Sequence, residues 1–276
     1  MLSATTVIVL VTDDGIFIGA DSKVTPIYIG GSDHDELVRI QKVFALKDRF
    51  LIATASLAHS NLDLRVFDPR TGELEPSKFT YDSAESIAAI DELLTVQSSF
   101  SDLIAAIESV ATGPLRTYSF FIKLPKERQF NPVGVWVAGT FDHGIPVVSA
   151  VGYSVDWERG FLKPAEIIPW HPSFGNSFGI RRGFYAVGLS DAVAEVEKAR
   201  QSGISDTDGF RYCMSHAFWP CYHFTTDSYL PAQEAVTLLR TLLRLQATRT
   251  PIEVGPPYCI FLLRREGGID RFEFQD

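Results

Sequence analysis

Two residue types that can take part in nucleophilic chemistry lie close together near the start of the chain. Thr5 and Thr6 begin an apolar, β-branched run that is typical of a strand buried on both faces. The dipeptide Asp14-Gly15 follows, and it predicts a tight hairpin turn because glycine tolerates a positive φ. A second strand over residues 16–20 would then return Asp21 to the side of the two threonines. We therefore expect a hydroxyl nucleophile and a carboxylate to share one end of a sheet.

This opening stretch resembles the start of a proteasome β-subunit, a member of the N-terminal-nucleophile (Ntn) hydrolase family. The resemblance rests on the Thr-Thr strand, the Asp-Gly turn and the sequence Gly-Ala-Asp-Ser-Lys at residues 19–23. It extends to residues 41–56, which place a lysine before a turn and an apolar strand. In that family a propeptide is removed before a threonine, which becomes the catalytic N-terminus.

The resemblance implies a role for four positions. The family's nucleophile falls on Thr5, its activating lysine on Lys42, and the carboxylate that anchors this lysine on Asp21. The backbone N–H of Ser56 takes the position of a glycine in the family's oxyanion hole. Met1–Ala4 would be a short propeptide, because a peptide-bonded nitrogen cannot act as a base.

These residue types suit threonine-type hydrolysis of amides, with peptides or proteins as the expected substrates and no cofactor. A threonine hydroxyl is a weak nucleophile until a base takes its proton, and a terminal amine can be that base. The reference pKa of an α-amino group is about 7.7–8.0, so much of it can be neutral near physiological pH. A neighbouring lysine ammonium would lower the pKa values of the amine and the hydroxyl, and an aspartate would hold that lysine charged.

Each position also has a purely structural interpretation. Thr5 and Thr6 fit an ordinary β-branched strand, and Asp21 fits a turn or cap residue. Lys42, which precedes an apolar run, fits a solvated strand edge. The order and spacing of these residues, taken together, favour the catalytic interpretation.

Other positions depart from the family pattern. Ala4 stands in place of a glycine, and Leu189 stands where the family has a serine unless the match slips to Ser190. The family's late aspartate and serine before the final strand are not visible, although Glu253 is a candidate substitute. Two alternatives therefore stay open: a non-catalytic, proteasome-like structural subunit, and an Ntn amidase that acts on a small molecule.

Composition excludes several other classes of function. The chain has 276 residues, 46% of them hydrophobic and 21% charged, as in an ordinary globular protein. A net charge of −9 and a pI near 5.2 argue against nucleic acid or an anionic membrane as the main partner. No apolar run approaches the roughly 20 residues that span a bilayer. Met1–Ala4 is too short for a signal peptide, so we predict a cytoplasmic protein. The resemblance also implies a ring-shaped homo-oligomer.

One segment, residues 213–223, gathers side chains that can bind a metal. It contains two cysteines and two histidines, and the chain has three cysteines in all, an odd number that fits a reducing compartment. The spacings within the segment are not those of common zinc modules, and the segment is rich in aromatic residues. We therefore predict a packed element and no metal site. The residues concerned are Cys213, His216, Cys221 and His223, and the third cysteine is Cys259.

The rest of the pattern predicts one α+β domain over residues 1–276, built as the four-layer αββα sandwich of the Ntn hydrolases. Helical periodicity predicts helices over residues 82–96, 99–111, 190–202, 207–218 and 231–247, with the second ended by Gly113-Pro114. Residues 57–68 look like the start of another helix, which the turn signals at Asp68-Pro69 and Thr71-Gly72 break. Strands are expected at 117–124, at 133–153 with a turn at 142–144, at 184–188 and at 250–263.

Overall fold

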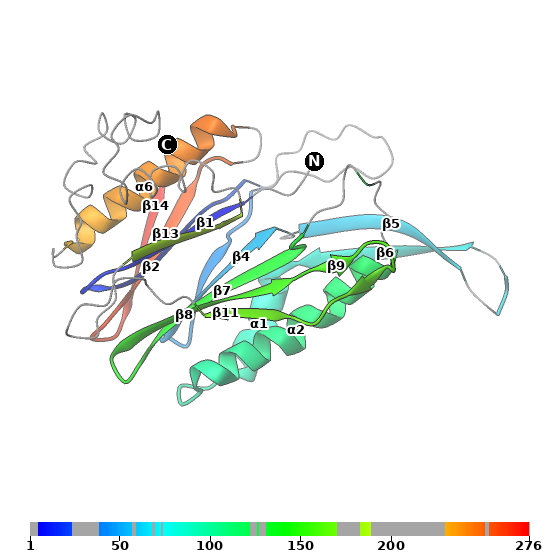
Figure 1. The fold of residues 1–276 in the computed structure, drawn as a ribbon, viewed down its shortest axis with the longest axis horizontal. Coiled ribbons are helices and arrows are strands. Elements are labelled where there is room, and N and C mark those ends of the chain that lie inside the picture. The colour runs from blue at the N-terminus through cyan, green and yellow to red at the C-terminus, as the bar shows by residue number, and fades with distance from the viewer. Residues whose placement is uncertain are drawn as a thin grey trace.

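The structure is a computed structural model of the chain, and it describes residues 5–23, 39–56, 59–67, 70–72, 74–121, 126, 131–169, 183–188, 230–251 and 254–275. In these residues it combines α-helices with antiparallel sheets (Figure 1). The prediction of a chain that mixes helices with strands is thereby confirmed. The finer prediction of an Ntn-type sandwich is taken up with the proposed function.

The first five-stranded sheet contains the hairpin with which the described chain begins. Its strands lie in the order β12–β1–β2–β13–β14. Their bounds are Gly183–Gly188 for β12, Thr6–Val11 for β1, Gly15–Asp21 for β2, Tyr258–Arg264 for β13 and Ile269–Phe274 for β14. Every residue of β1 and β2 is buried, as the unbroken apolar runs predict.

The second five-stranded sheet has the order β11–β8–β7–β4–β3. Its strands are β11 (Glu166–Pro169), β8 (Ile145–Tyr153), β7 (Gly134–Asp142), β4 (Phe50–Ser56) and β3 (Val43–Leu46). The predicted hairpin over 133–153 is confirmed. Its turn consists of His143 and Gly144, which both have positive φ values, of 49° and 75°.

Three apolar clusters hold these elements together. Alternate residues of β1, such as Ile8 and Leu10, pack with helix α6 (Ala232–Arg249). The intervening residues, such as Val7 and Val9, pack against β3, β4, β7 and β8 of the second sheet. The opposite face of the second sheet packs against helices α1 (Ser83–Leu93) and α2 (Phe100–Phe121) (Figure 1). The central strands of both sheets are therefore covered on both faces.

A two-stranded ribbon follows the second sheet's strand β4. It consists of β5 (His59–Phe67) and β6 (Leu74–Asp82), and it extends to the right in Figure 1. The interpretation of residues 57–68 as the start of a helix is therefore wrong. The sequence HSNLDLRVF alternates polar and apolar residues in its second half, which is the two-residue period of a strand.

Helix α2 is longer than the sequence predicts, because it continues through Pro114 to Phe121. The prediction of a helix end at Gly113-Pro114, and of a strand over 117–124, is wrong. Proline in a helix interior removes one hydrogen bond and costs about 3 kcal/mol. Here the apolar stripe continues past the proline, since Ala111 and Leu115 on either side of it are both fully buried in the same cluster.

The other predicted elements divide into two groups. Helices α1 and α6 and strand β12 form close to their predicted positions, and β13 occupies only the second half of the strand expected over 250–263. The helices expected over 190–202 and 207–218, and the cysteine- and histidine-containing segment 213–223, lie outside the described residues. In the part of the chain that is described, no helix has the length and apolar character needed to cross a membrane.

Candidate active site

An ion pair between Lys42 and Asp21 joins the two sheets at one end. The Lys42 Nζ atom lies 3.1 Å from Asp21 Oδ1, and neither side chain has any exposed surface. Asp21 is the last residue of β2, and Lys42 directly precedes β3. The structural interpretation of Lys42 as a solvated strand edge is thus wrong, and the predicted approach of these two residues is observed.

The β1–β2 hairpin fixes the position of the Asp21 carboxylate. Val7 pairs with Ala20, which puts Asp21 beside Thr6 at the end of the hairpin. Asp21 Oδ1 accepts a hydrogen bond of 3.0 Å from the Thr6 backbone N–H, and Oδ2 accepts one of 3.1 Å from the Lys23 backbone N–H. The carboxylate therefore has two backbone donors and one ammonium donor.

The Lys42 ammonium has a second partner, which the sequence analysis did not identify. Its Nζ atom donates to the backbone carbonyl oxygen of Lys23. The Lys42 backbone is held as well, because its carbonyl accepts a hydrogen bond of 3.0 Å from the Thr54 N–H. Every residue has a backbone carbonyl, so this partner could not have been inferred from residue types.

Burial acts against the charged form of both side chains. It raises the pKa of the Asp21 carboxyl and lowers the pKa of the Lys42 ammonium. The attraction between the two charges, and the hydrogen bonds that the carboxylate accepts, act in the opposite direction. Each residue thus depends on the other to stay charged.

Thr5 lies directly before β1, with 2% of its surface exposed, and the neighbouring Thr6 is completely buried. The N–H of Thr6, the residue that follows Thr5, donates to the Asp21 carboxylate, so the ion pair lies beside the neighbour of Thr5. Among the described residues, no hydrogen bond joins the Thr5 side chain to Lys42 or Asp21. Catalytic hydrogen bonds are often long in unliganded structures and tighten when substrate is bound.

Ser56 is the last residue of β4, the strand that pairs with the edge strand β3 in the second sheet. Two residues earlier, the Thr54 N–H points toward Lys42, to which it donates. Because N–H groups two residues apart in a strand point to the same side, the Ser56 N–H faces this same edge. The predicted oxyanion donor thus comes from the edge of β4 where Lys42 lies.

The segment that follows α6 is fastened to the residues after Asp21. Lys23 Nζ donates to the Pro251 carbonyl at 2.5 Å, and Ser22 Oγ donates to the Pro257 carbonyl at 2.6 Å. The Gly255 carbonyl accepts a longer bond of 3.4 Å from the Ser22 N–H. Leu189, Ser190 and Glu253, which bear on the catalytic interpretation, lie outside the described residues.

No potential metal centre is found in the described part of the chain: it contains no group of three or more His, Cys, Asp or Glu residues arranged to hold an ion. Cys259 is buried in β13 and is not in a disulfide.

No protein-family model matches the chain, and no curated protein matches it. Many solved structures are similar to it, and three of them are described here. The Gly-1 mutant of Anbu from Hyphomicrobium sp. strain MC1 has a TM-score of 0.52 and 9% identity, over 98% of this chain and 87% of that chain. The helical assembly of the Anbu complex from Pseudomonas aeruginosa has a TM-score of 0.48 and 11% identity, over 98% and 87%. A second structure of Hyphomicrobium Anbu has a TM-score of 0.48 and 10% identity, over the same shares.

The similarity to the Gly-1 mutant of Hyphomicrobium Anbu establishes a shared fold. At 9% sequence identity, this similarity says nothing about activity. It also corrects the family assignment made from the sequence. The resemblance of residues 5–56 to a proteasome β-subunit is wrong as an assignment, because the solved structure that shares this fold is one of Anbu. The chain therefore has an Anbu-like fold.

Proposed function

We propose that this protein is a threonine-type amide hydrolase whose nucleophile is Thr5. The observation that carries the proposal is the buried Lys42–Asp21 ion pair, which is hydrogen-bonded to the Thr6 N–H one residue from the proposed nucleophile. A buried ammonium at this place would favour the deprotonated forms of a nearby amine and hydroxyl. Peptides or proteins are the proposed substrates.

The proposed reaction has two steps. The free amine of Thr5 accepts the hydroxyl proton while Oγ attacks the carbonyl carbon of the amide, and the Ser56 N–H stabilises the negative oxygen that forms. The C–N bond then breaks, the leaving amine takes the proton, and an ester to Thr5 remains. Water hydrolyses this ester, with the same amine as base, and releases the carboxylic acid. Lys42 keeps its proton throughout.

This chemistry requires cleavage between Ala4 and Thr5. While the bond is intact, the Thr5 nitrogen is an amide and cannot accept the hydroxyl proton. The first measurement is therefore the intact mass of the purified protein. We expect the mass of residues 1–4 to be missing from the wild type and retained in Thr5→Ala.

A second candidate function is a structural subunit without activity. The observation that favours it is the number of donors to the Asp21 carboxylate, which already binds the N–H groups of Thr6 and Lys23 as well as Lys42. Such a carboxylate can serve simply to clamp the ends of β1, β2 and β3. A protein that retains residues 2–4, and cleaves no member of a fluorogenic peptide library, would support this function and contradict the hydrolase.

Activity needs a matched set of variants. Thr5→Ser keeps the hydroxyl and should retain measurable hydrolysis, whereas Thr5→Ala should abolish it. Thr6→Val serves as a control because it keeps a β-branched side chain and the N–H that binds Asp21. Equal activity in Thr5→Ala and the wild type would refute the assignment of the nucleophile.

We extend the proposal to the architecture. The order of helix α6, two facing sheets and helices α1 and α2 supports the four-layer αββα sandwich in a single domain, because three separate apolar clusters lie between successive layers. A ring-shaped homo-oligomer remains a prediction, which native mass spectrometry would test. A protein that stays monomeric at micromolar concentration would contradict it.

A further inference from the structure

Ser22 lies between the two residues that hold the Lys42 ammonium. The acceptors of Lys42 Nζ are the Asp21 carboxylate and the Lys23 backbone carbonyl, one on each side of Ser22 in the chain. The Lys23 N–H also donates to Asp21 Oδ2 at 3.1 Å, so residues 21 and 23 are bonded to each other across Ser22. The position of Ser22 therefore affects both acceptors of Lys42 at once.

Three hydrogen bonds fix Ser22 to two other segments of the chain. Its Oγ donates to the Pro257 carbonyl at 2.6 Å, and its N–H donates to the Gly255 carbonyl at 3.4 Å. Its own carbonyl accepts a bond of 2.9 Å from the N–H of Ile40, two residues before Lys42. Ser22 thus fastens the end of β2, which carries the acceptors, to the stretch that carries the lysine.

The carbonyl that accepts the Ser22 hydroxyl belongs to a firmly held stretch of backbone. Pro257 directly precedes β13, the strand that pairs with β2. On its other side, the Val254 N–H donates to the Thr250 carbonyl at 2.9 Å, and Val254 is buried. The bond from Ser22 therefore ends on a part of the chain that is fixed from both directions.

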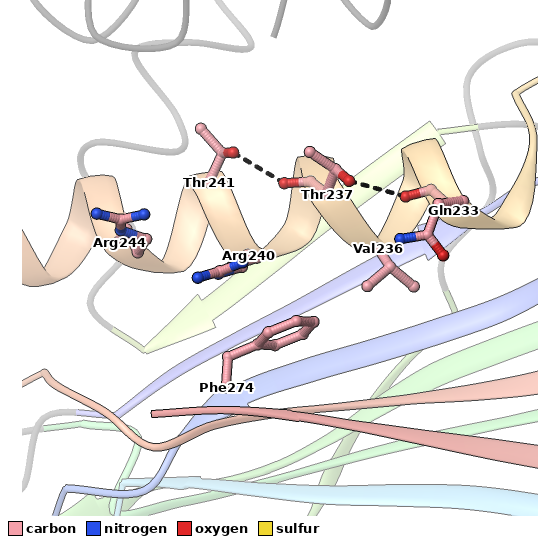
Figure 2. A pocket seen from close by; sticks show the side chains of 7 residues that line it. All are labelled: Gln233, Val236, Thr237, Arg240, Thr241, Arg244 and Phe274. Atoms are coloured by element: carbon pink, nitrogen blue, oxygen red, sulfur yellow. Dashed lines mark hydrogen bonds between the residues drawn. The ribbon is translucent and has the colours of Figure 1, made fainter. Parts of the chain in front are cut away.

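Helix α6, which leads into this stretch, is anchored on the first sheet. Its apolar residues pack against β1, β2 and β13. Beside a pocket of about 210 Å³, the Arg240 guanidinium lies over the Phe274 ring of β14, with Cζ 4.6 Å from the ring centroid (Figure 2). The hydroxyls of Thr237 and Thr241 donate to backbone carbonyls one turn earlier in the helix, at 2.9 and 2.8 Å (Figure 2). These contacts hold the anchor of Ser22 independently of the site.

We propose that Ser22 is a positioning residue of the site, whose hydroxyl holds both acceptors of the Lys42 ammonium in place against the first sheet. Its effect on Thr5 is transmitted by Lys42. The inference rests on the proposed function, which it extends from the ion pair to the residue that sets the geometry of the pair.

The expected consequence follows from the charges that act on Lys42. Within the described chain, the charged group that stabilises the Lys42 ammonium is Asp21, while Lys23 directs its own ammonium to the Pro251 carbonyl. Burial already lowers the pKa of Lys42. Loss of the Ser22 hydroxyl should loosen both acceptors, so the ammonium should give up its proton at a lower pH than in the wild type.

The protonation of Lys42 can be followed without a substrate. In protein labelled with ¹³C-lysine, the NMR shift of Cε reports the loss of the ammonium proton as pH rises. We expect Lys42 to titrate at a lower pH in Ser22→Ala than in the wild type, and Ser22→Thr, which keeps the hydroxyl, should restore the wild-type midpoint. The matched control is Ser86→Ala in α1, because this equally buried hydroxyl also donates to a backbone carbonyl, that of Asp82 at 3.2 Å. Its Lys42 midpoint should equal that of the wild type.

Kinetics give a second readout that a merely structural role would not move. Ser22→Ala should lower kcat by about two- to tenfold, the effect of losing one hydrogen bond. KM should stay unchanged, because the nucleophile is affected and substrate binding is not. Ser86→Ala should leave both constants at their wild-type values.

An unchanged Lys42 midpoint in a folded Ser22→Ala variant would overturn the proposal, and so would an equal shift in Ser86→Ala. Should Ser22→Ala fail to fold, Ser22→Cys keeps a side chain of similar size whose thiol donates only weakly, and it should lower the midpoint as well. An unchanged midpoint in that variant would also overturn the proposal. Failure of the hydrolase proposal is recognised separately, as a wild type that is inactive and retains residues 2–4, because the NMR titration needs no activity.

Discussion

Lys42 Nζ lies 3.1 Å from Asp21 Oδ1 in a pair with no exposed surface; Asp21 ends a strand of one sheet, and Lys42 directly precedes a strand of the other. The charges are therefore removed from water at the place where the end of β2 meets the start of β3. Removing two charges from water is expensive, and their mutual attraction repays this only while both are present. The pair thus makes each of the two residues strongly dependent on the other.

Loss of the lysine alone should be severe. We expect Lys42→Met to lower the free energy of unfolding by about 3–5 kcal/mol, because it leaves the Asp21 carboxylate buried without its counter-charge. Asp21→Asn/Lys42→Met should lose less than the sum of the two single variants, since asparagine is neutral and can still accept from the Thr6 N–H. Urea unfolding of the four proteins measures this coupling. Additive losses would show that the pair contributes no interaction energy of its own.

The pH dependence of stability should change in a defined direction. Burial raises the pKa of Asp21 above its ordinary 3.8, while Lys42 acts to lower it, so the pKa should rise further in Lys42→Met. Between pH 3.8 and this raised pKa, the folded variant binds more protons than the unfolded chain. Its stability must therefore fall as pH increases over that window.

The comparison that checks this is the urea midpoint from pH 4 to pH 7 for Lys42→Met and for Asp21→Asn/Lys42→Met. The single variant should lose stability relative to the double variant as pH rises. Parallel curves for the two proteins would contradict a raised pKa for Asp21.

Lys23 should matter for activity more than for stability. Its carbonyl accepts from Lys42 Nζ, and its own Nζ donates to the Pro251 carbonyl in the segment after α6. The lowered pKa of Lys42 predicts that hydrolysis declines on the alkaline side before pH 10.5. Lys23→Met removes the hydrogen bond to Pro251, so the Lys23 carbonyl should be held less firmly against Lys42 Nζ. The Lys42 ammonium then loses part of its stabilisation, and the alkaline decline in activity should move to lower pH.

In Lys23→Met the change in unfolding free energy should stay within about 1 kcal/mol, because the side chain is only partly buried and one hydrogen bond is lost. Lys23→Arg can still reach the Pro251 carbonyl, and it should restore the wild-type pH profile of kcat/KM. An identical profile in all three proteins would remove Lys23 from the mechanism. A large loss of stability would instead indicate a structural role.

The core of the site could be predicted because it depends on one local element. A hairpin fixes which residues face each other, so the approach of Asp21 to Thr6 followed from the apolar runs and the turn between them. The pairing of β3 with β4 likewise follows from residues that are close in sequence. The carbonyl of Lys23 was missed, because a backbone group has no signature in the residue types.

Other parts of the fold could not be predicted because tertiary packing decided them. Pro114 signals the end of a helix, yet α2 continues since Leu115 is needed in the apolar cluster beneath the second sheet. The sequence suggests the start of a helix over residues 57–68, where the structure has strand β5, because short apolar runs do not distinguish the two structures. The family assignment from residues 5–56 was wrong because a hairpin followed by a lysine does not identify one family, and the solved structure that shares the fold is one of Anbu.

The sequence suggests that Gly15 is needed because it tolerates a positive φ in the hairpin turn, but the structure gives another reason. The turn consists of Asp13 and Asp14, Gly15 is already the first residue of β2, and its φ is not among the positive values. A Cβ atom placed on it would lie 2.2 Å from the Leu263 carbonyl oxygen. The glycine is therefore needed because the backbones of β2 and β13 come close together.

Gly15→Ala should consequently be among the most damaging alanine substitutions in the chain. We expect it to lower the free energy of unfolding by about 3 kcal/mol, at the upper end of the range for overpacking, because β13 must move away from β2. The matched control is Gly152→Ala in β8, where the nearest atom to an added Cβ is 3.8 Å away. That change should be neutral or add about 0.4–1 kcal/mol, since alanine restricts the unfolded chain. Thermal and urea unfolding of both variants would check the pair, and equal effects would contradict the close approach of β2 and β13.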